Sequence, residues 1–283
     1  MKLWLWPALL VVFLLPALSF GQQPQMQPLT FWYGYHVNPG KESEFLDLIK
    51  TVGQPVRDKL LEEGVVLAWG VDVPLLRVPG ESTHLIWYAV SDYAGVEKVA
   101  DAMKAQIAKL DEEAAKGGVA KKGAKPAGVS DRLREIVDVQ KTHDFLTRDL
   151  LIGISPSLSG NVLPWTRFAF VKVKPGKGAE FRKAWEKYNK PIYDKLLADG
   201  VILGYGLSIE EVRTSGEFTH FAWVDTKNLA DMEKLRAAFN ADRDRRSQEE
   251  QDAMTGLFAS LLDLDASRQE LTQSIIFHVH APK

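Results

Sequence analysis

The apolar positions of the chain change from an alternating period to a helical period, and this change occurs twice in the same way. Runs rich in aromatic and β-branched residues at 31–37 and 167–173 are typical of strands. A Pro-Gly pair ends each run, and apolar residues then recur at helical spacing, as they do over 45–56. Pro55 lacks an amide hydrogen and crowds the preceding turn, so we expect it to kink or break this helix. Gly64 is placed to end the helix.

The remaining elements of the first unit follow from the same two periods. The segments 65–73 and 84–90 predict two strands joined by a loop. A second helix, rich in alanine and charged residues, is expected to begin near Tyr93 and to resume over 130–145 after an interruption. A strand over 150–154 is expected to close the unit.

The same order of elements returns 136 residues later, together with recurring motifs. Val-Asn-Pro-Gly-Lys at 37–41 returns as Val-Lys-Pro-Gly-Lys at 173–177, and Asp-Lys-Leu-Leu at 58–61 returns at 194–197. The second unit is expected to end with a strand over 275–280. An internal repeat of this length indicates two copies of one domain.

The repeat sets the predicted domain boundaries. The first copy is assigned to 29–155, with a Gly/Ala/Lys-rich insertion at about 115–128 that is expected to be flexible. The second copy is assigned to 165–283, and a linker rich in Ser, Pro, Gly and Asn at 156–164 joins the two. Each copy has the order β-α-β-β-α-β, which predicts an α+β fold of two tandem ferredoxin-like domains.

The motifs of the repeat resemble those of the dimeric α/β-barrel superfamily, which includes the antibiotic-biosynthesis-monooxygenase-like proteins. The resemblance is carried by a strand followed by Pro-Gly-Lys, by a first helix broken by proline, and by the strand motif Gly-Val-x-Leu-x-Trp/Tyr-Gly, which begins at Gly64 and Gly200. In that superfamily two ferredoxin-like domains pair sheet to sheet, usually from two chains. The resemblance implies that the two copies of this chain pair into one intramolecular α/β barrel, either as a monomer with pseudo-dimeric repeats or within a homodimer.

The N-terminal segment has the pattern of a secretory signal peptide. Lys2 precedes an apolar run over 3–18, and small residues follow near 19–21. The apolar run is shorter than the roughly 20 residues that span a bilayer, which argues against an uncleaved anchor. We therefore expect a signal peptide at 1–21, a Gln/Pro-rich linker at 22–28, and a mature protein that is periplasmic or extracellular and has no membrane contact after cleavage.

Charge and cysteine content exclude several classes of function. The formal net charge is −2, so the chain has no overall attraction for nucleic acid, and we expect no nucleic-acid partner. The chain has no cysteine, which excludes disulfides, thiolate zinc sites, c-type haem attachment and iron–sulfur clusters.

Two histidines recur in the repeat and are the candidate catalytic residues. His84 and His220 each begin a predicted strand and are each followed three residues later by a tryptophan, Trp87 or Trp223. Alternation along a strand places the histidine and the tryptophan on opposite faces of the sheet. A histidine here can act as a proton shuttle or a ligand in its own half of the chain. The alternative is a structural residue that ties the preceding loop to the sheet.

A second histidine pair lies at the end of the chain. His278 and His280 share one face of the last predicted strand, and two imidazoles at this spacing can bind one metal ion. His36 on the first strand is the candidate third ligand. The first copy has Gly153 and Ser155 at the matching positions, so the pair is not a property of the repeat and is a weak metal-site candidate.

Aromatic side chains are the predicted ligand-binding residues. Tyr33 and Tyr35 lie on the aromatic first strand, and Trp87 and Trp223 lie on the third strand of each copy. A pocket lined by such side chains suits a planar apolar ligand. The alternative is that these side chains fill the core, since aromatic residues dominate the buried area of many cores.

Three functions remain open. The aromatic strand, with no phosphate loop or nucleophile elbow, favours an exported protein that binds a small apolar or aromatic molecule inside the barrel. The superfamily resemblance implies a cofactor-independent or haem-linked monooxygenase-like enzyme, although the Asn/Trp/His set of the haem-degrading members cannot be placed residue by residue in this sequence. The residues to test for that activity are His84, His220, Trp87 and Trp223. The third possibility is a structural or partner-binding module of the cell envelope.

Overall fold

The computed structural model describes residues 27–78, 80–117, 128–159, 162–214 and 218–279. The predicted signal peptide, most of the linker at 22–28 and most of the insertion at 115–128 lie outside these residues. Within the described ranges, no helix is long and apolar enough to cross a membrane.

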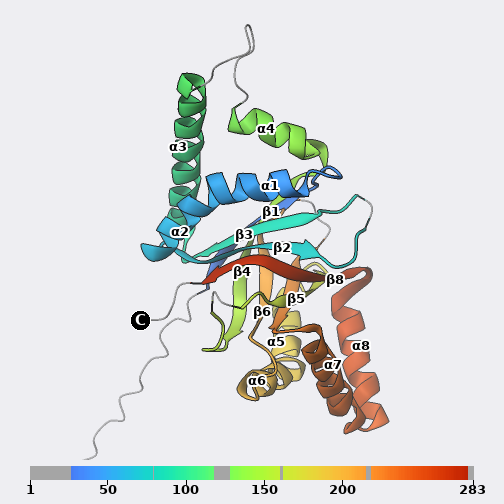
Figure 1. Cartoon of the computed structure of the whole chain (residues 1–283). Coiled ribbons are helices and arrows are strands. Elements are labelled where there is room, and N and C mark those ends of the chain that lie inside the picture. The colour runs from blue at the N-terminus through green and yellow to red at the C-terminus, as the bar shows by residue number, and fades with distance from the viewer. Residues whose placement is uncertain (1–26, 79, 118–127, 160–161, 215–217, 280–283) are drawn as a thin grey trace, which may run out of the picture.

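Each repeat contributes four strands and a set of helices (Figure 1). The first repeat contains β1 (Leu29–Tyr35), α1 (Glu42–Leu48), a π-helical segment (Ile49–Gly53), α2 (Gln54–Glu62), β2 (Val66–Pro74), β3 (His84–Val90), α3 (Tyr93–Gly117), α4 (Val129–Ile136) and β4 (His143–Ile154). The second repeat contains β5 (Trp165–Val173), α5 (Gly178–Tyr188), α6 (Lys190–Ala198), β6 (Gly204–Val212), β7 (His220–Thr226), α7 (Leu229–Asp244), α8 (Gln248–Leu261) and β8 (Leu262–Val279).

The eight strands close into one barrel in the order β1-β3-β2-β8-β5-β7-β6-β4. Every neighbouring pair is antiparallel, and the two repeats join where β2 meets β8 and where β6 meets β4. Because four antiparallel steps separate β1 from β5, equivalent strands run in the same direction. Equivalent residues of the two repeats therefore lie at the same level of the barrel. The prediction of two ferredoxin-like repeats that form one intramolecular barrel is confirmed.

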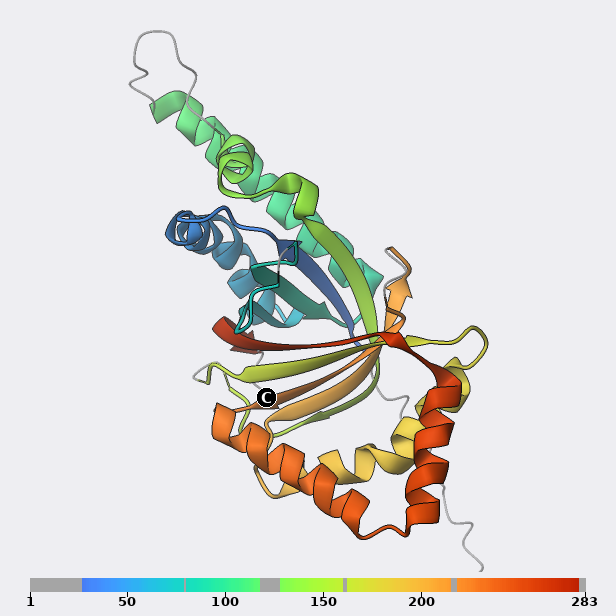
Figure 2. The ribbon, with the colours of Figure 1, turned by 90° about the vertical axis from the view of Figure 1, so that its right-hand side faces the viewer.

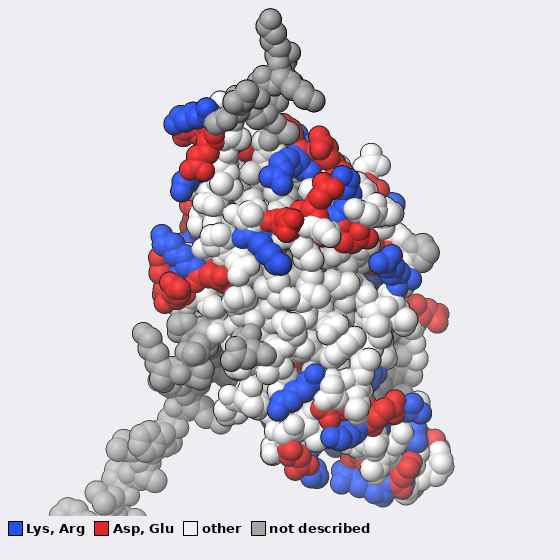
Figure 3. Space-filling view, viewed as in Figure 1, with Lys and Arg blue, Asp and Glu red and all other residues white. Residues whose placement is uncertain are grey.

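The helices form two layers on opposite sides of the barrel. Helices α1 to α4 cover the outer face of the first repeat's strands, and α5 to α8 cover that of the second (Figure 1 and Figure 2). On the face seen in Figure 3, charged side chains gather over these two layers, and the belt between them carries few. The outer face of the sheet is thus covered by helices, and its inner face lines the interior of the closed barrel.

The expected break in the first helix is present in both repeats. In the first repeat a π-helical segment ends at Gly53, and Pro55 stands in the first turn of α2. In the second repeat α5 ends at Tyr188 and Pro191 stands in the first turn of α6. The turn that ends α2 contains Gly64 with a φ of 72°, a left-handed conformation that glycine adopts without strain.

Two strands begin earlier than the local pattern predicts, so those boundaries were wrong. Helix α4 ends at Ile136 and β4 begins at His143, where the sequence predicts a helix over 130–145. Likewise β8 begins at Leu262, not near Ile275. The first part of β4 pairs with β1 and its later part with β6 of the other repeat, and β8 pairs in the same way with β5 and β2. A strand that pairs with one strand from each repeat must be long enough for both partners. The local pattern of apolar residues does not show that the second partner exists.

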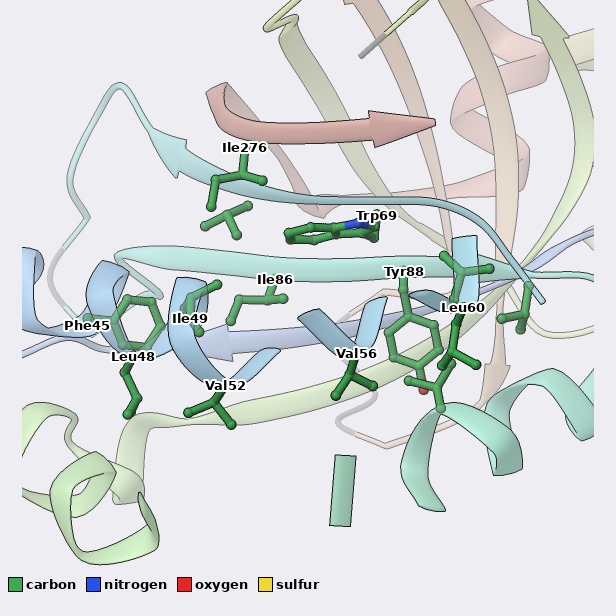
Figure 4. Packing of buried hydrophobic residues seen from close by; sticks show 14 of the residues in the cluster. Phe45, Leu48, Ile49, Val52, Val56, Leu60, Trp69, Ile86, Tyr88 and Ile276 are labelled. Carbon is green, nitrogen blue, oxygen red and sulfur yellow. The ribbon is translucent and has the colours of Figure 1, made fainter. Parts of the chain in front are cut away.

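Each repeat has its own hydrophobic core between sheet and helices. Figure 4 shows the first, in which Phe45, Ile49 and Val56 from the helical side pack towards Trp69 and Tyr88 of the sheet. Burying one such side chain contributes roughly 1.5–3 kcal/mol. This layer fixes the helices on the outer face and leaves the inner face free to build a site.

Candidate functional site

Aromatic side chains fill the middle of the barrel. Trp32 stacks on Phe145, with ring centroids 5.7 Å apart, and meets Phe168 edge-on at 5.6 Å. These contacts close the barrel at its waist but leave one end hollow. The other members of the cluster are Phe170, Phe218 and Phe221, with Trp87 and Trp223 packed against it.

The hollow end encloses a cavity of about 260 Å³, which we call the barrel-end cavity. It lies at the level where β1 and β5 begin and where β3 and β8 end. None of the described residues that line it is a Lys, Arg or His. Its walls include the aromatic residues Trp32, Trp87, Phe168, Trp223 and Phe277, and its polar groups are Thr30, Thr166, Ser274, Asp72, Asp149 and Asp225.

One tryptophan of the cavity is fixed by a buried carboxyl group. The indole Nε1 of Trp87 donates to Asp72 Oδ2 at 2.9 Å. Ser274, which reaches in from β8, donates to Asp72 Oδ1 at 2.6 Å. The carboxyl group of Asp72 therefore links the two repeats where β2 meets β8.

The opposite wall repeats this arrangement with the acid and the serine exchanged. Asp149 on β4 accepts hydrogen bonds from Ser208 on β6 and from the indole of Trp223. Ser208 is the repeat counterpart of Asp72, so each junction between the repeats holds one aspartate and one serine. The two tryptophans are consequently held in equivalent positions around the barrel axis.

Two glycines give these indoles their space. A Cβ atom at Gly70 would lie 2.9 Å from the ring of Trp87, and one at Gly206 would lie still closer to the ring of Trp223. Each indole thus packs against a glycine of the neighbouring strand. This explains why both glycines recur in the repeat.

The third carboxyl group, Asp225, has no counterpart in the first repeat, where Ala89 occupies the position. It is only 7% exposed, and Thr166 Oγ1 donates to its Oδ1 at 2.7 Å. Among the described residues no hydrogen bond reaches its Oδ2, and the side chain lines the barrel-end cavity. That oxygen can accept a hydrogen bond from a bound molecule.

Burial makes all three carboxyl groups weaker acids than usual. Desolvation raises the pKa of Asp72 and of Asp149 to about 6, although their hydrogen-bond donors oppose the shift. Desolvation raises the pKa of Asp225 to about 7, and the charge of Asp72 adds to this effect. These groups exchange protons near neutral pH, the range that suits a general base.

The candidate histidines lie on the other face of the sheet, as alternation predicts. His84 Nδ1 is 3.0 Å from Thr83 Oγ1, and the ring packs on Phe45 of α1. His220 is placed in the same way beside Thr219. Burial lowers the pKa of each histidine to about 4, so both are neutral at pH 7. Neither lines the barrel-end cavity, and these contacts match the structural alternative.

The four predicted ligand-binding residues do not share one cavity. Trp87 and Trp223 line the barrel-end cavity. Tyr33 and Tyr35 lie on the outer face beneath the helices of the first repeat, where Tyr35 packs on Phe45. The sheet therefore separates the two tyrosines from the two tryptophans.

The second repeat has a cavity where the first has these tyrosines. Ala169 and Val171 occupy the positions of Tyr33 and Tyr35, and a cavity of about 400 Å³ lies between them and the helices. We call it the sheet–helix cavity. It is lined by Phe181, Trp185, Tyr193, Phe239 and Phe258 among others, with Arg167 and Arg236 also contributing.

The weak metal-site candidates are not assembled within the described residues. His278 stacks on Trp69, and its Nδ1 lies 3.4 Å from Asp58 Oδ1. His36 Nδ1 bonds to the carbonyl of Glu81 at 2.9 Å, while His280 lies outside the described residues. Over the described ranges, no three His, Asp or Glu side chains are grouped to hold a metal ion.

The barrel-end cavity does not fit haem. Haem iron is held in proteins by His, Cys, Met or Tyr, and none of the described lining residues is of these types. The cavity, at about 260 Å³, is also smaller than the roughly 300–1,000 Å³ of pockets that hold drug-sized ligands.

The three aspartates are the site residues that sequence reasoning missed. Asp72 stands between Val71 and Val73 in an otherwise apolar strand, whereas Asp149 follows Arg148 and Asp225 is next to last in its strand. A charged residue in the middle of such a strand is a signal for a buried polar site. This signal does not identify the face that lies inside the barrel, because residues on both faces of each strand are buried.

No protein-family profile and no curated protein sequence matches the chain. Among solved structures, a candidate monooxygenase from Fusobacterium nucleatum subsp. nucleatum matches with 12% identity and a TM-score of 0.59, over 90% of this chain and 95% of that one. A candidate monooxygenase from Lactobacillus acidophilus matches with 7% identity and a TM-score of 0.56, over 90% and 97%. An anthrone oxidase-like protein matches with 11% identity and a TM-score of 0.51, over 92% and 96%. The chain therefore has the dimeric α/β-barrel fold, with both ferredoxin-like halves supplied by one polypeptide.

Proposed function

We propose that the chain binds a small planar aromatic molecule in the barrel-end cavity. The observation that carries this proposal is the position of Asp225, a buried carboxyl group with one oxygen left to accept a bond, on the wall of an aromatic cavity. An apolar pocket with a few convergent polar groups is the usual form of a small-molecule site. Perturbed acidity in such a pocket supports the same interpretation.

The volume of the cavity limits the size of the ligand. A protein cavity of about 150 Å³ holds benzene. A cavity of about 260 Å³ is therefore suited to roughly two fused rings. A hydroxyl group on the ring is the simplest donor to Asp225, so naphthol is an appropriate probe.

Isothermal titration calorimetry with naphthol tests the proposal with two matched variants. Ala89→Leu extends a side chain into the barrel-end cavity, and Ala169→Leu does the same in the sheet–helix cavity. We expect the first variant to bind naphthol at least tenfold more weakly than the wild type and the second to bind it unchanged. An absence of binding to the wild type, or a loss caused by Ala169→Leu alone, would contradict the proposal.

The second candidate function is a cofactor-independent oxygenase. Three proteins of the same fold are described as candidate monooxygenases or as anthrone oxidase-like, which favours this class. In this scheme Asp225 accepts a hydroxyl proton of a dihydroxynaphthalene, and the resulting anion reacts with dioxygen at a ring carbon. One oxygen atom stays on that carbon as a carbonyl oxygen of a hydroxynaphthoquinone. The other leaves as water, which takes up the ring hydrogen and the proton held by Asp225. An oxygen electrode tests it with dihydroxynaphthalene as substrate. Consumption lost in Asp225→Asn supports the scheme, and consumption equal to that of buffer excludes it for this substrate.

We also propose that the protein acts outside the cytoplasm, on the basis of the signal-peptide pattern at 1–21. Cell fractionation of the expressed full chain, with the N-terminus of the product determined, tests this. Cleavage near Gln22 is the expected result, and an intact N-terminus in the cytosol would contradict it. The role of a cell-envelope partner-binding module stays a prediction.

A further inference from the structure

We propose that the ligand of the barrel-end cavity is a cation, a small aromatic molecule that carries a protonated amine, with Asp225 as its ion-pair partner. This inference rests on the proposed function and names the class of ligand. It follows from the charge of the cavity, from the free oxygen of Asp225 and from the aromatic walls.

The cavity carries acidic groups with no basic partner. Three carboxyl groups line it, and among its described lining residues there is no Lys, Arg or His. Two other buried carboxylates, Asp231 and Asp242, are paired with a cation, whereas Glu210 is held by Thr214 without one. Asp231 lies 2.7 Å from the Lys234 ammonium, and Asp242 lies 2.8 Å from the Arg246 guanidinium. A buried charge without a partner is costly, so the cavity favours a ligand that supplies the missing positive charge.

Asp225 is the carboxyl group with room for that charge. Asp72 and Asp149 each use their oxygens to hold a serine and a tryptophan. Within the described chain, Asp225 accepts one side-chain hydrogen bond, from Thr166 to its Oδ1. Its side chain is buried, with 7% of its surface exposed. An ammonium group that reaches Oδ2 forms a charge-assisted hydrogen bond, which is stronger than a neutral one.

The walls of the cavity suit an organic cation. The faces of Trp and Phe rings attract positive charge, and cages of aromatic residues recognise ammonium ligands in many proteins. Trp32, Trp87 and Trp223 all line this cavity. A bare metal ion is not favoured, because no group of three potential metal ligands is formed within the described residues.

Calorimetry at pH 8 with three ligands that share one ring system tests the charge preference. The probes are naphthylmethylamine, the neutral naphthalenemethanol and the anionic naphthoate. We expect the amine to bind at least tenfold more tightly than the alcohol, and naphthoate to bind most weakly. Asp225→Asn should reduce the affinity for the amine at least tenfold while the alcohol binds within about twofold of the wild type. Ala169→Leu serves as the matched control and should leave all three affinities unchanged.

The possible outcomes separate this inference from the proposed function. Equal binding of the amine and the alcohol, both weakened by Ala89→Leu, refutes the cation preference and leaves the aromatic site intact. Failure of all three probes to bind refutes both. If Asp225→Asn does not fold, the pH dependence of the wild type decides the matter. The affinity for the amine should fall at least tenfold from pH 8 to pH 5, because the carboxyl groups become neutral while the amine stays charged, and a constant affinity overturns the inference.

Discussion

Replacement of Asp225 by asparagine should stabilise the protein, and more so at alkaline pH. Asparagine has nearly the shape of the protonated carboxyl group and can keep the hydrogen bond from Thr166. The wild-type carboxyl group is deprotonated above its pKa of about 7, where it places a charge without a cation in a buried site. The variant removes that charge.

The magnitude follows from the change in acidity on folding. The pKa of Asp225 is about 7 in the folded protein and about 3.9 in an unfolded chain, and each unit corresponds to about 1.4 kcal/mol. Because the folded state holds this proton more tightly, the group lowers the free energy of unfolding as pH rises from about 4 to about 7. The penalty approaches ~4 kcal/mol at pH 8 and is ~1–2 kcal/mol at pH 5. We expect Asp225→Asn to recover a large part of it.

Urea unfolding of both proteins at pH 5, 6, 7 and 8 measures this effect. The stability gain of Asp225→Asn should increase by roughly 1–3 kcal/mol from pH 5 to pH 8. Asp265→Asn, at an exposed position of β8, controls for the loss of one negative charge and should change stability by less than about 0.5 kcal/mol. A gain that is equal at pH 5 and pH 8, or a loss of stability at pH 8, would show that Asp225 is not an uncompensated buried charge.

Three further substitutions test other parts of the structure. Trp87→Phe removes a donor to Asp72 and should lower the free energy of unfolding by roughly 1–3 kcal/mol in urea titrations, more at pH 8 than at pH 5, because the ionised carboxylate needs the donor most. His84→Gln should leave the affinity for naphthol unchanged in calorimetry, because His84 lies beneath the helices; a tenfold loss would restore it as a site residue. Arg57→Met should be neutral or stabilising in a thermal melt, because Nε and Nη1 of this buried guanidinium have no hydrogen-bond partner in the described chain; a fall in Tm of more than about 4 °C would contradict this.

The fold was predictable from the sequence because the same pattern of elements occurs in both copies of the repeat. The Pro-Gly turns, the broken first helix and the strand motif at Gly64 occur at the same offset in both copies, so each copy supports the assignment of the other. The early starts of β4 and β8 were not predictable. They depend on pairing with β6 and β2 of the other repeat, which lie far away in the sequence.

The site was predictable only in part. The recurrence of Trp87 and Trp223 pointed to residues that line the barrel-end cavity. The tyrosines at 33 and 35 looked equally suitable, because alternation assigns residues to a face and does not say whether that face meets the helices or the barrel interior. Asp225 stands where the first repeat has alanine, so a search for recurring residues passes over it.

The proposed function places a small aromatic molecule in the hollow end of the barrel. A crystal structure of the full mature chain grown with naphthol tests it most directly. We expect a planar ligand between Trp87 and Trp223, with its hydroxyl group within hydrogen-bond distance of Asp225. A ligand found only in the sheet–helix cavity beside Ala169, or a barrel end closed by side chains, would contradict it.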